Sequence, residues 1–178
     1  MGQSNKKNTK GNPLIPILLI VTIIAVGVSI WAMFFRDSGP TLAPDYAPQE
    51  EEQYAEEIPN DDGEKMEQPQ GGGSVSLSYS REVTVDLSDK LAGLYFANPG
   101  KSNQDILLQI VIQDQVIVQS GTLKPGNRVT SLELLDNAAG MLAAGGYEGK
   151  FVVFYYDPVT AEKAVVNTEI PVTITVTE

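Results

Sequence analysis

The stretch that decides the fold is "DILLQIVIQDQVIVQSG", which runs from Asp105 to Gly121. Its first half alternates with period two, the spacing that places side chains on one face of a β-strand. The shared face consists of Ile106, Leu108, Ile110 and Ile112. Asp114-Gln115 then separates this strand from a second apolar run, "VIVQSG". Two short strands joined by polar residues predict a β-hairpin.

The same alternation recurs on both sides of this hairpin, from residue 75 to residue 178. The matching segments are "VSLSY" (75–79), "VTVDL" (83–87), "GLYFAN" (93–98), "RVTSLEL" (128–134), "YEGKFVVFYY" (147–156) and "TEIPVTITV" (168–176). Seven or eight short strands in a domain of this length are typical of an immunoglobulin-like sandwich. We therefore expect an all-β domain over residues 75–178.

Several residues between the strands have structural roles in this interpretation. Pro125-Gly126 has type II turn chemistry, because proline presets φ and glycine accepts a positive φ. Tyr147 follows a glycine-rich corner, where a sandwich tyrosine can hydrogen-bond back across the turn. Residues 137–146, "NAAGMLAAGG", suit a short helical turn or a simple loop. Pro171 predicts that the last strand is bulged or lies at a sheet edge there.

An uncharged stretch of 22 residues, Leu14–Phe35, precedes all of this. As a helix it would extend roughly 33 Å, enough to cross a bilayer core. It is too long for the apolar part of a cleaved signal peptide. Because lysines crowd residues 1–13, this tail is expected in the cytoplasm. The sequence thus predicts a single-pass plasma-membrane protein whose C-terminal domain lies outside the cell.

Residues 36–74 form an acidic segment between the apolar stretch and the β domain. From residue 37 it holds eleven Asp or Glu against Lys65 alone, in a chain whose net charge is −11. It also contains five prolines and the run Gly71-Gly72-Gly73. Low hydrophobicity with high charge of one sign is typical of a disordered chain. We expect a disordered linker that holds the β domain away from the membrane.

The composition restricts the chemistry. The chain has no cysteine and no histidine, which excludes disulfides, thiolate catalysis, Cys or His zinc sites and Ser-His-Asp triads. Its acidity disfavours binding to nucleic acid. We expect no cofactor, no metal and no catalytic residue. The carboxylate pairs Asp86/Asp89 and Glu133/Asp136 leave a wall hydrolase as an alternative that would need paired acids in a pocket.

The turns of the β domain carry a family resemblance. The segments that carry it are "ANPGKSN" (Ala97–Asn103), "SGTLKPGNRV" (Ser120–Val129) and "LAAGGYEGKF" (Leu142–Phe151). The chain resembles small Gram-positive proteins with one membrane span, a polar linker and an immunoglobulin-like extracytoplasmic domain. The resemblance implies a membrane-anchored surface protein and transfers no functional residue.

The leading functional hypothesis is a non-enzymatic module that binds another protein or a wall component, or serves as an accessory subunit of a cell-surface assembly. Its candidate partner-binding loop consists of Lys101, Ser102, Asn103 and Gln104, which are polar; an ordinary turn is the alternative. A regulatory single-span protein acting through helix association is a further alternative, because Ala25 and Ser29 form a small-xxx-small pair.

Overall fold

The computed structural model describes residues 22, 24–26, 43–69 and 72–178. The chain forms two compact units, Met1–Gly39 and Pro40–Glu178. In the first unit the described residues are helical. The tail 1–13 and most of the expected membrane span 14–35 lie outside the described residues. Within the part that is described, no helix is both long enough and apolar enough for a membrane crossing.

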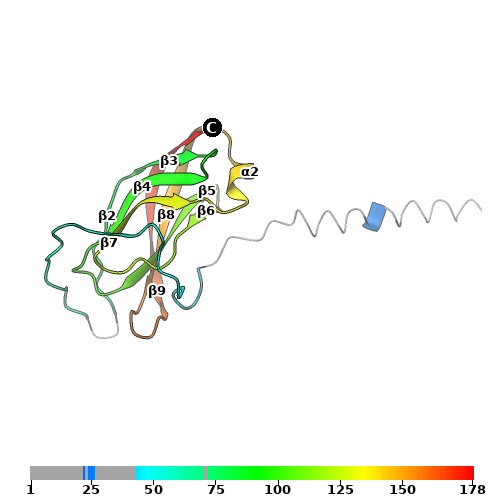
Figure 1. The fold of residues 1–178 in the computed structure, drawn as a ribbon. Coiled ribbons are helices and arrows are strands. Elements are labelled where there is room, and N and C mark those ends of the chain that lie inside the picture. The colour runs from blue at the N-terminus through cyan, green and yellow to red at the C-terminus, as the bar shows by residue number, and fades with distance from the viewer. Residues whose placement is uncertain (1–21, 23, 27–42, 70–71) are drawn as a thin grey trace, which may run out of the picture. The chain divides into compact units, whose positions relative to one another are not determined.

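The regular secondary structure of the second unit is almost entirely β-strand (Figure 1). The strands are β1 (Glu56–Glu57), β2 (Ser78–Tyr79), β3 (Glu82–Asp86), β4 (Leu91–Asn98), β5 (Asp105–Ile112), β6 (Gln115–Gln119), β7 (Asn127–Glu133), β8 (Gly145–Tyr156) and β9 (Lys163–Thr177). One short helix, α2 (Ala138–Met141), lies between β7 and β8, inside the segment where the sequence suggests a helical turn. All strands except β1 lie in residues 75–178, here called the head.

The strands form a single curled sheet in the order β1-β7-β4-β3-β9-β8-β5-β6, and β2 also pairs with β4. Strand β3 joins the two halves, because it pairs antiparallel with β4 and parallel with β9. The other pairings are antiparallel, including the predicted β5–β6 hairpin. The all-β prediction for the head is therefore confirmed.

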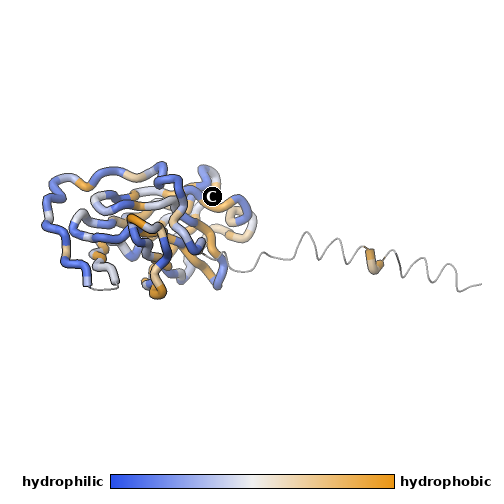
Figure 2. The backbone as a smooth tube through the Cα atoms, turned by 90° about the horizontal axis from the view of Figure 1, so that it is seen from below, coloured by the Kyte–Doolittle hydropathy of each residue, from blue (hydrophilic) through white to orange (hydrophobic). Residues whose placement is uncertain are grey.

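The curled sheet encloses one main apolar core. Ile106, Leu108, Ile110 and Ile112, the predicted face of β5, all belong to it. Across this core Phe96 of β4 packs edge-on against Phe151 of β8, with ring centroids 5.6 Å apart. Such a T-shaped pair is a favoured aromatic arrangement. Hydrophobic residues are frequent in the middle of the domain in Figure 2, whereas the surrounding loops are mainly hydrophilic.

The turns follow local residue chemistry. Gln113 and Asp114 both have positive φ, 50° and 63°, as the two-residue turns of β-hairpins require. Gly126 has φ of 90°, and the Asn127 amide donates to the Lys124 carbonyl at 3.2 Å, so Pro125-Gly126 form the expected turn. Pro171 lies where β9 has β8 as its strand neighbour, since pairing with β3 begins at Thr173.

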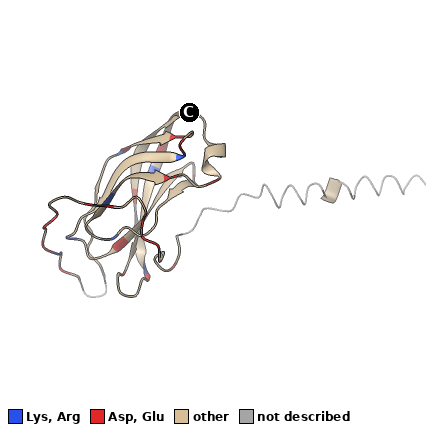
Figure 3. Ribbon diagram, viewed as in Figure 1, with Lys and Arg blue, Asp and Glu red and all other residues tan. Residues whose placement is uncertain are grey.

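The prediction of a disordered linker is wrong for residues 43–69 and 72–74, here called the strap. The strap runs across the head and forms strand β1 on the edge of β7. It is hydrophilic in Figure 2, and acidic residues lie along its length in Figure 3. Composition correctly indicates that the strap has no core of its own. It becomes ordered because its backbone hydrogen-bonds to strand edges of the head, a contribution that composition does not measure.

Candidate interaction surface

The predicted partner-binding loop lies between β4 and β5 and faces into the molecule. Ser102 is fully buried and Gln104 is 5% exposed. The Ser102 hydroxyl accepts a hydrogen bond from the Ser76 amide at 2.9 Å and lies 3.1 Å from the Ser76 carbonyl, to which it donates. Of the four predicted residues, Lys101 is the exposed one. The loop is therefore not a free binding surface, which corrects the sequence prediction.

The strap is the partner of this loop. The Met66 amide donates to the Lys101 carbonyl at 2.8 Å, and the Ser74 amide donates to Asn103 Oδ1 at 2.7 Å. Lys65 Nζ donates to the Ser102 carbonyl at 3.2 Å. The loop's polarity serves contacts within the chain, and sequence alone could not distinguish these contacts from contacts with another molecule.

The predicted structural tyrosine makes the contact that was expected of it. The Tyr147 hydroxyl donates to the Ala143 carbonyl at 2.9 Å and accepts from the Ala143 amide at 3.2 Å. Both bonds reach back four residues across the corner between α2 and β8. These bonds join the two sides of the corner, so the phenol makes a structural contact.

A groove of about 690 Å³ lies on the outer face of strands β5, β6, β8 and β9. Its apolar lining includes Val111, Val116, Val152 and Phe154. The three valines form an apolar cluster separate from the main core, with Phe154 packed against it. Residues on the outer face of a half-solvated sheet are ordinarily polar. An apolar groove at this position is therefore a candidate binding surface.

Charged side chains of both signs surround the groove. Lys150 Nζ lies 3.0 Å from Glu169 Oε2, and Lys163 Nζ lies 3.3 Å from Asp45 Oδ1. A second hollow of about 530 Å³ adjoins it and shares Val111, Lys150 and Glu169. An apolar centre with a polar rim is the usual composition of a protein-binding surface.

Sequence reasoning missed this groove, although a signal for it was present. In "DILLQIVI" the residues of the second face include Leu107 and Val111, and in "FVVFYY" they include Val152 and Phe154. These strands are thus apolar on both faces, unlike β3, where exposed and buried residues alternate. A strand that is apolar on both faces indicates that other groups pack against each face of the sheet there.

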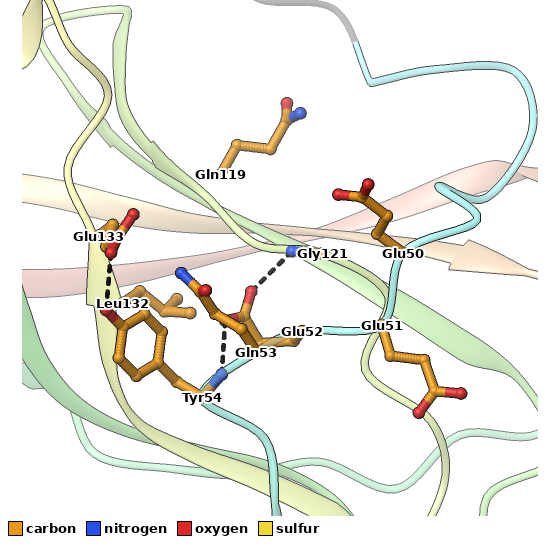
Figure 4. Close-up of a pocket in the computed structure, with 9 residues that line it drawn as sticks. All are labelled: Glu50, Glu51, Glu52, Gln53, Tyr54, Gln119, Gly121, Leu132 and Glu133. Atoms are coloured by element: carbon orange, nitrogen blue, oxygen red, sulfur yellow. Dashed lines mark hydrogen bonds between the residues drawn. The ribbon is translucent and has the colours of Figure 1, made fainter.

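A smaller hollow of about 250 Å³ lies where the strap passes β6 and β7 (Figure 4). The largely buried Glu52 carboxylate accepts hydrogen bonds from the Gly121 amide at 2.7 Å and the Tyr54 amide at 3.0 Å. The Tyr54 hydroxyl donates to Glu133 Oε1 at 2.7 Å, and this bond raises the pKa of Tyr54. The acids are engaged in holding the strap in place.

The carboxylate pairs considered for hydrolysis have other partners in the structure. Asp86 Oδ1 accepts hydrogen bonds from the Asp89 and Ser88 amides, which lower the pKa of Asp86. The Glu133 carboxylate accepts a hydrogen bond from the Tyr54 hydroxyl.

Another acid, Asp105 at the start of β5, is largely buried. Burial raises the pKa of Asp105, and the positive charge of Lys124 opposes this effect. Among the described residues, no group of three or more acids is arranged to hold a metal ion.

The first residues of the strap are held by a buried tyrosine, which gives a pH prediction. Tyr156 is fully buried and its hydroxyl donates to the Pro44 carbonyl at 2.9 Å. Burial, followed by the charge of Asp45, raises the pKa of Tyr156 to about 12, above the ordinary value near 10. Because the pKa is raised on folding, this contribution to stability is full below pH 10 and is lost as the pH approaches 12.

Absorbance titration at 295 nm checks this prediction. We expect one of the seven tyrosines to ionise near pH 12 and to be missing from the Tyr156→Phe titration. As the pH rises from 10 to 12, the thermal unfolding midpoint of the natural chain should decrease, and that of the variant should decrease less. A Tyr156→Phe chain with the natural titration curve would contradict the buried position of this phenol.

Comparison with known proteins gives little further information. No protein-family model matches the sequence, and no curated protein is significantly similar to it. Among solved structures, one similar chain is AggA, the major subunit of aggregative adherence fimbriae type I from Escherichia coli. It is 11% identical, the match covers 60% of this chain and 97% of that chain, and the TM-score is 0.29. At that TM-score the likeness supports no statement about fold or function.

Proposed function

We propose that this protein is a non-enzymatic, membrane-anchored module that displays an immunoglobulin-like β-sandwich outside the cell and binds a protein or wall component there. The groove on the outer face of β5, β6, β8 and β9 carries the binding part of the proposal, because it combines an apolar floor with a rim of both charges. The uncharged stretch Leu14–Phe35 supports the anchor.

The strand order supports the immunoglobulin-like assignment. A sandwich of this type has one sheet containing the second and fifth strands and another containing the third, sixth and seventh. If β3 is counted as the first strand, β4 and β7 are the second and fifth, and they pair with each other. The third, sixth and seventh strands are then β5, β8 and β9, which lie side by side, with β6 next to β5. We also propose the resemblance to small Gram-positive surface proteins, which rests on the segments Ala97–Asn103, Ser120–Val129 and Leu142–Phe151.

Photo-crosslinking in the native host tests the binding surface. A photoreactive residue at Asn167, which lines the groove, should give a repeatable adduct with one partner. The same residue at Val159, which is 90% exposed and outside the groove lining, is the control. Equal adducts at both positions, or none at Asn167, would contradict binding through the groove.

A matched pair of charge reversals strengthens the test. Lys150→Glu should lower the adduct at position 167 about tenfold, because it reverses a rim charge, the kind of change that weakens recognition through electrostatic complementarity. Lys90→Glu makes the same change in net charge on the turn between β3 and β4 and should leave the adduct unchanged.

The location of the head is tested separately, by adding protease to intact cells. A head that resists the protease in intact cells but is cut in a lysate would contradict surface display.

A further inference from the structure

The first part of the strap, residues 43–58, here called the arm, is bound to the head mainly through its backbone. The Thr122 amide donates to the Glu50 carbonyl at 3.1 Å, and the Glu52 amide donates to the Thr122 carbonyl at 3.0 Å. Further along, Glu56 and Glu57 pair with β7, and the Ile58 amide donates to the Gly126 carbonyl at 2.8 Å. The head thus presents a row of backbone partners that fits an extended strand.

Charge complementarity selects an acidic strand for this surface. Three of the four salt bridges among the described residues join an acid of the arm to a base of the head. The pairs are Glu51–Lys124, Glu56–Arg128 and Asp45–Lys163. Exposed pairs of this kind hold the arm weakly. The surface therefore fits an acidic extended segment that can also leave it.

The turn after the arm is the hinge that an opened form would use. Pro59 and Asn60 reverse the chain directly after β1, and Asn60 has a φ of 56°, in the left-handed region. Asparagine adopts this conformation more readily than most non-glycine residues, but at a higher cost than glycine. Straightening the turn would relieve this cost and carry the arm away from its own head. Short hinges under strain are the setting in which identical elements exchange between copies.

We propose that the arm of one copy docks on the head of a second copy, in the place where its own arm lies in the single chain. Every copy carries both the arm and its surface, so the exchanged form keeps each contact described above. Only the turn at Pro59-Asn60 and the local concentration of the chain decide between the two forms. The arm also supplies Ala43, Pro44 and Asp45 to the lining of the proposed groove, so in the exchanged form the second copy completes that lining.

The absence of cysteine from the natural sequence permits a direct test in the full chain. Glu57 and Asn127 are Cα partners in the β1–β7 ladder, which is within disulfide range. Glu57→Cys and Asn127→Cys are placed in differently tagged chains and co-expressed. Under mild oxidation we expect a disulfide between the two tagged chains. The control pairs Glu57→Cys with Ser88→Cys, on the turn after β3, and should give at least tenfold less cross-linked product.

Two further variants make the outcome decisive. A single chain carrying both Glu57→Cys and Asn127→Cys reports the closed form through a disulfide within one molecule. Asn60→Gly removes the cost of the left-handed residue and should lower the intermolecular yield about threefold. The proposal is overturned if the double variant closes within one chain while the two-chain pair gives no more product than its control. It is overturned also if the double variant forms no disulfide, since the arm would not then lie on β7.

Discussion

Replacing Phe151 with alanine is expected to lower the free energy of unfolding by about 3–5 kcal/mol, the largest effect of any substitution discussed. Phe151 is fully buried in β8 and packs against Phe96 of β4, which is itself fully buried. Truncation removes the transfer energy of the ring and leaves a cavity between two strands that are distant in the sheet order. The surrounding β-sheet cannot close such a cavity without shifting its hydrogen-bonded strands.

Urea unfolding of the full chain measures this effect, with Val165→Ala as the matched control. Val165 lies in β9 and is fully exposed, so its truncation should change the unfolding free energy by less than about 0.5 kcal/mol. Equal effects of the two substitutions would show that β4 and β8 do not enclose a common core.

The strands were predictable from sequence because burial on one face imposes a period of two. In β3, Val83 and Val85 are buried and their neighbours are more exposed, as the alternation indicates. Pairing partners were not predictable in this way. The parallel contact of β3 with β9 joins residues that are some ninety positions apart, for example Val83 and Ile174. Periodicity assigns a residue to a face and carries no information about which strand lies beside it.

The surface contacts were harder to predict than the core, for a related physical reason. Glu52 belongs to a run of three glutamates, and such runs are ordinarily solvated. Its burial depends on the amide of Gly121, which is 69 residues away. Ser102 and Asn103 likewise bond to residues of the strap and its continuation. A polar residue whose hydrogen-bond partner is a distant backbone group cannot be distinguished, from sequence alone, from one that faces water or another molecule.

Gly121→Ala should release the arm from the head, because no side chain fits at this position. An added Cβ would lie 2.9 Å from the Glu52 nitrogen, 3.0 Å from the Glu52 Cα and 3.1 Å from the Glu50 oxygen, all backbone atoms of the arm. These atoms cannot rotate away, so the arm itself must move. The movement would disrupt the Gly121–Glu52 hydrogen bond and the neighbouring bonds to Thr122. We expect a loss of about 1–3 kcal/mol, typical of an overpacked contact.

Limited proteolysis after glutamate measures arm release, because the arm contains Glu50, Glu51, Glu52, Glu56 and Glu57. When opening is fast relative to cleavage, the cleavage rate follows the population of the open form, so a loss of about 1.4 kcal/mol gives tenfold faster cleavage. Gly140→Ala is the matched control, since its added Cβ meets no atom within 4 Å. If both variants are cleaved at the natural rate, the arm does not pack against Gly121. If Gly121→Ala alone is cleaved faster, the acidic segment is a folded part of the protein that a single methyl group can displace.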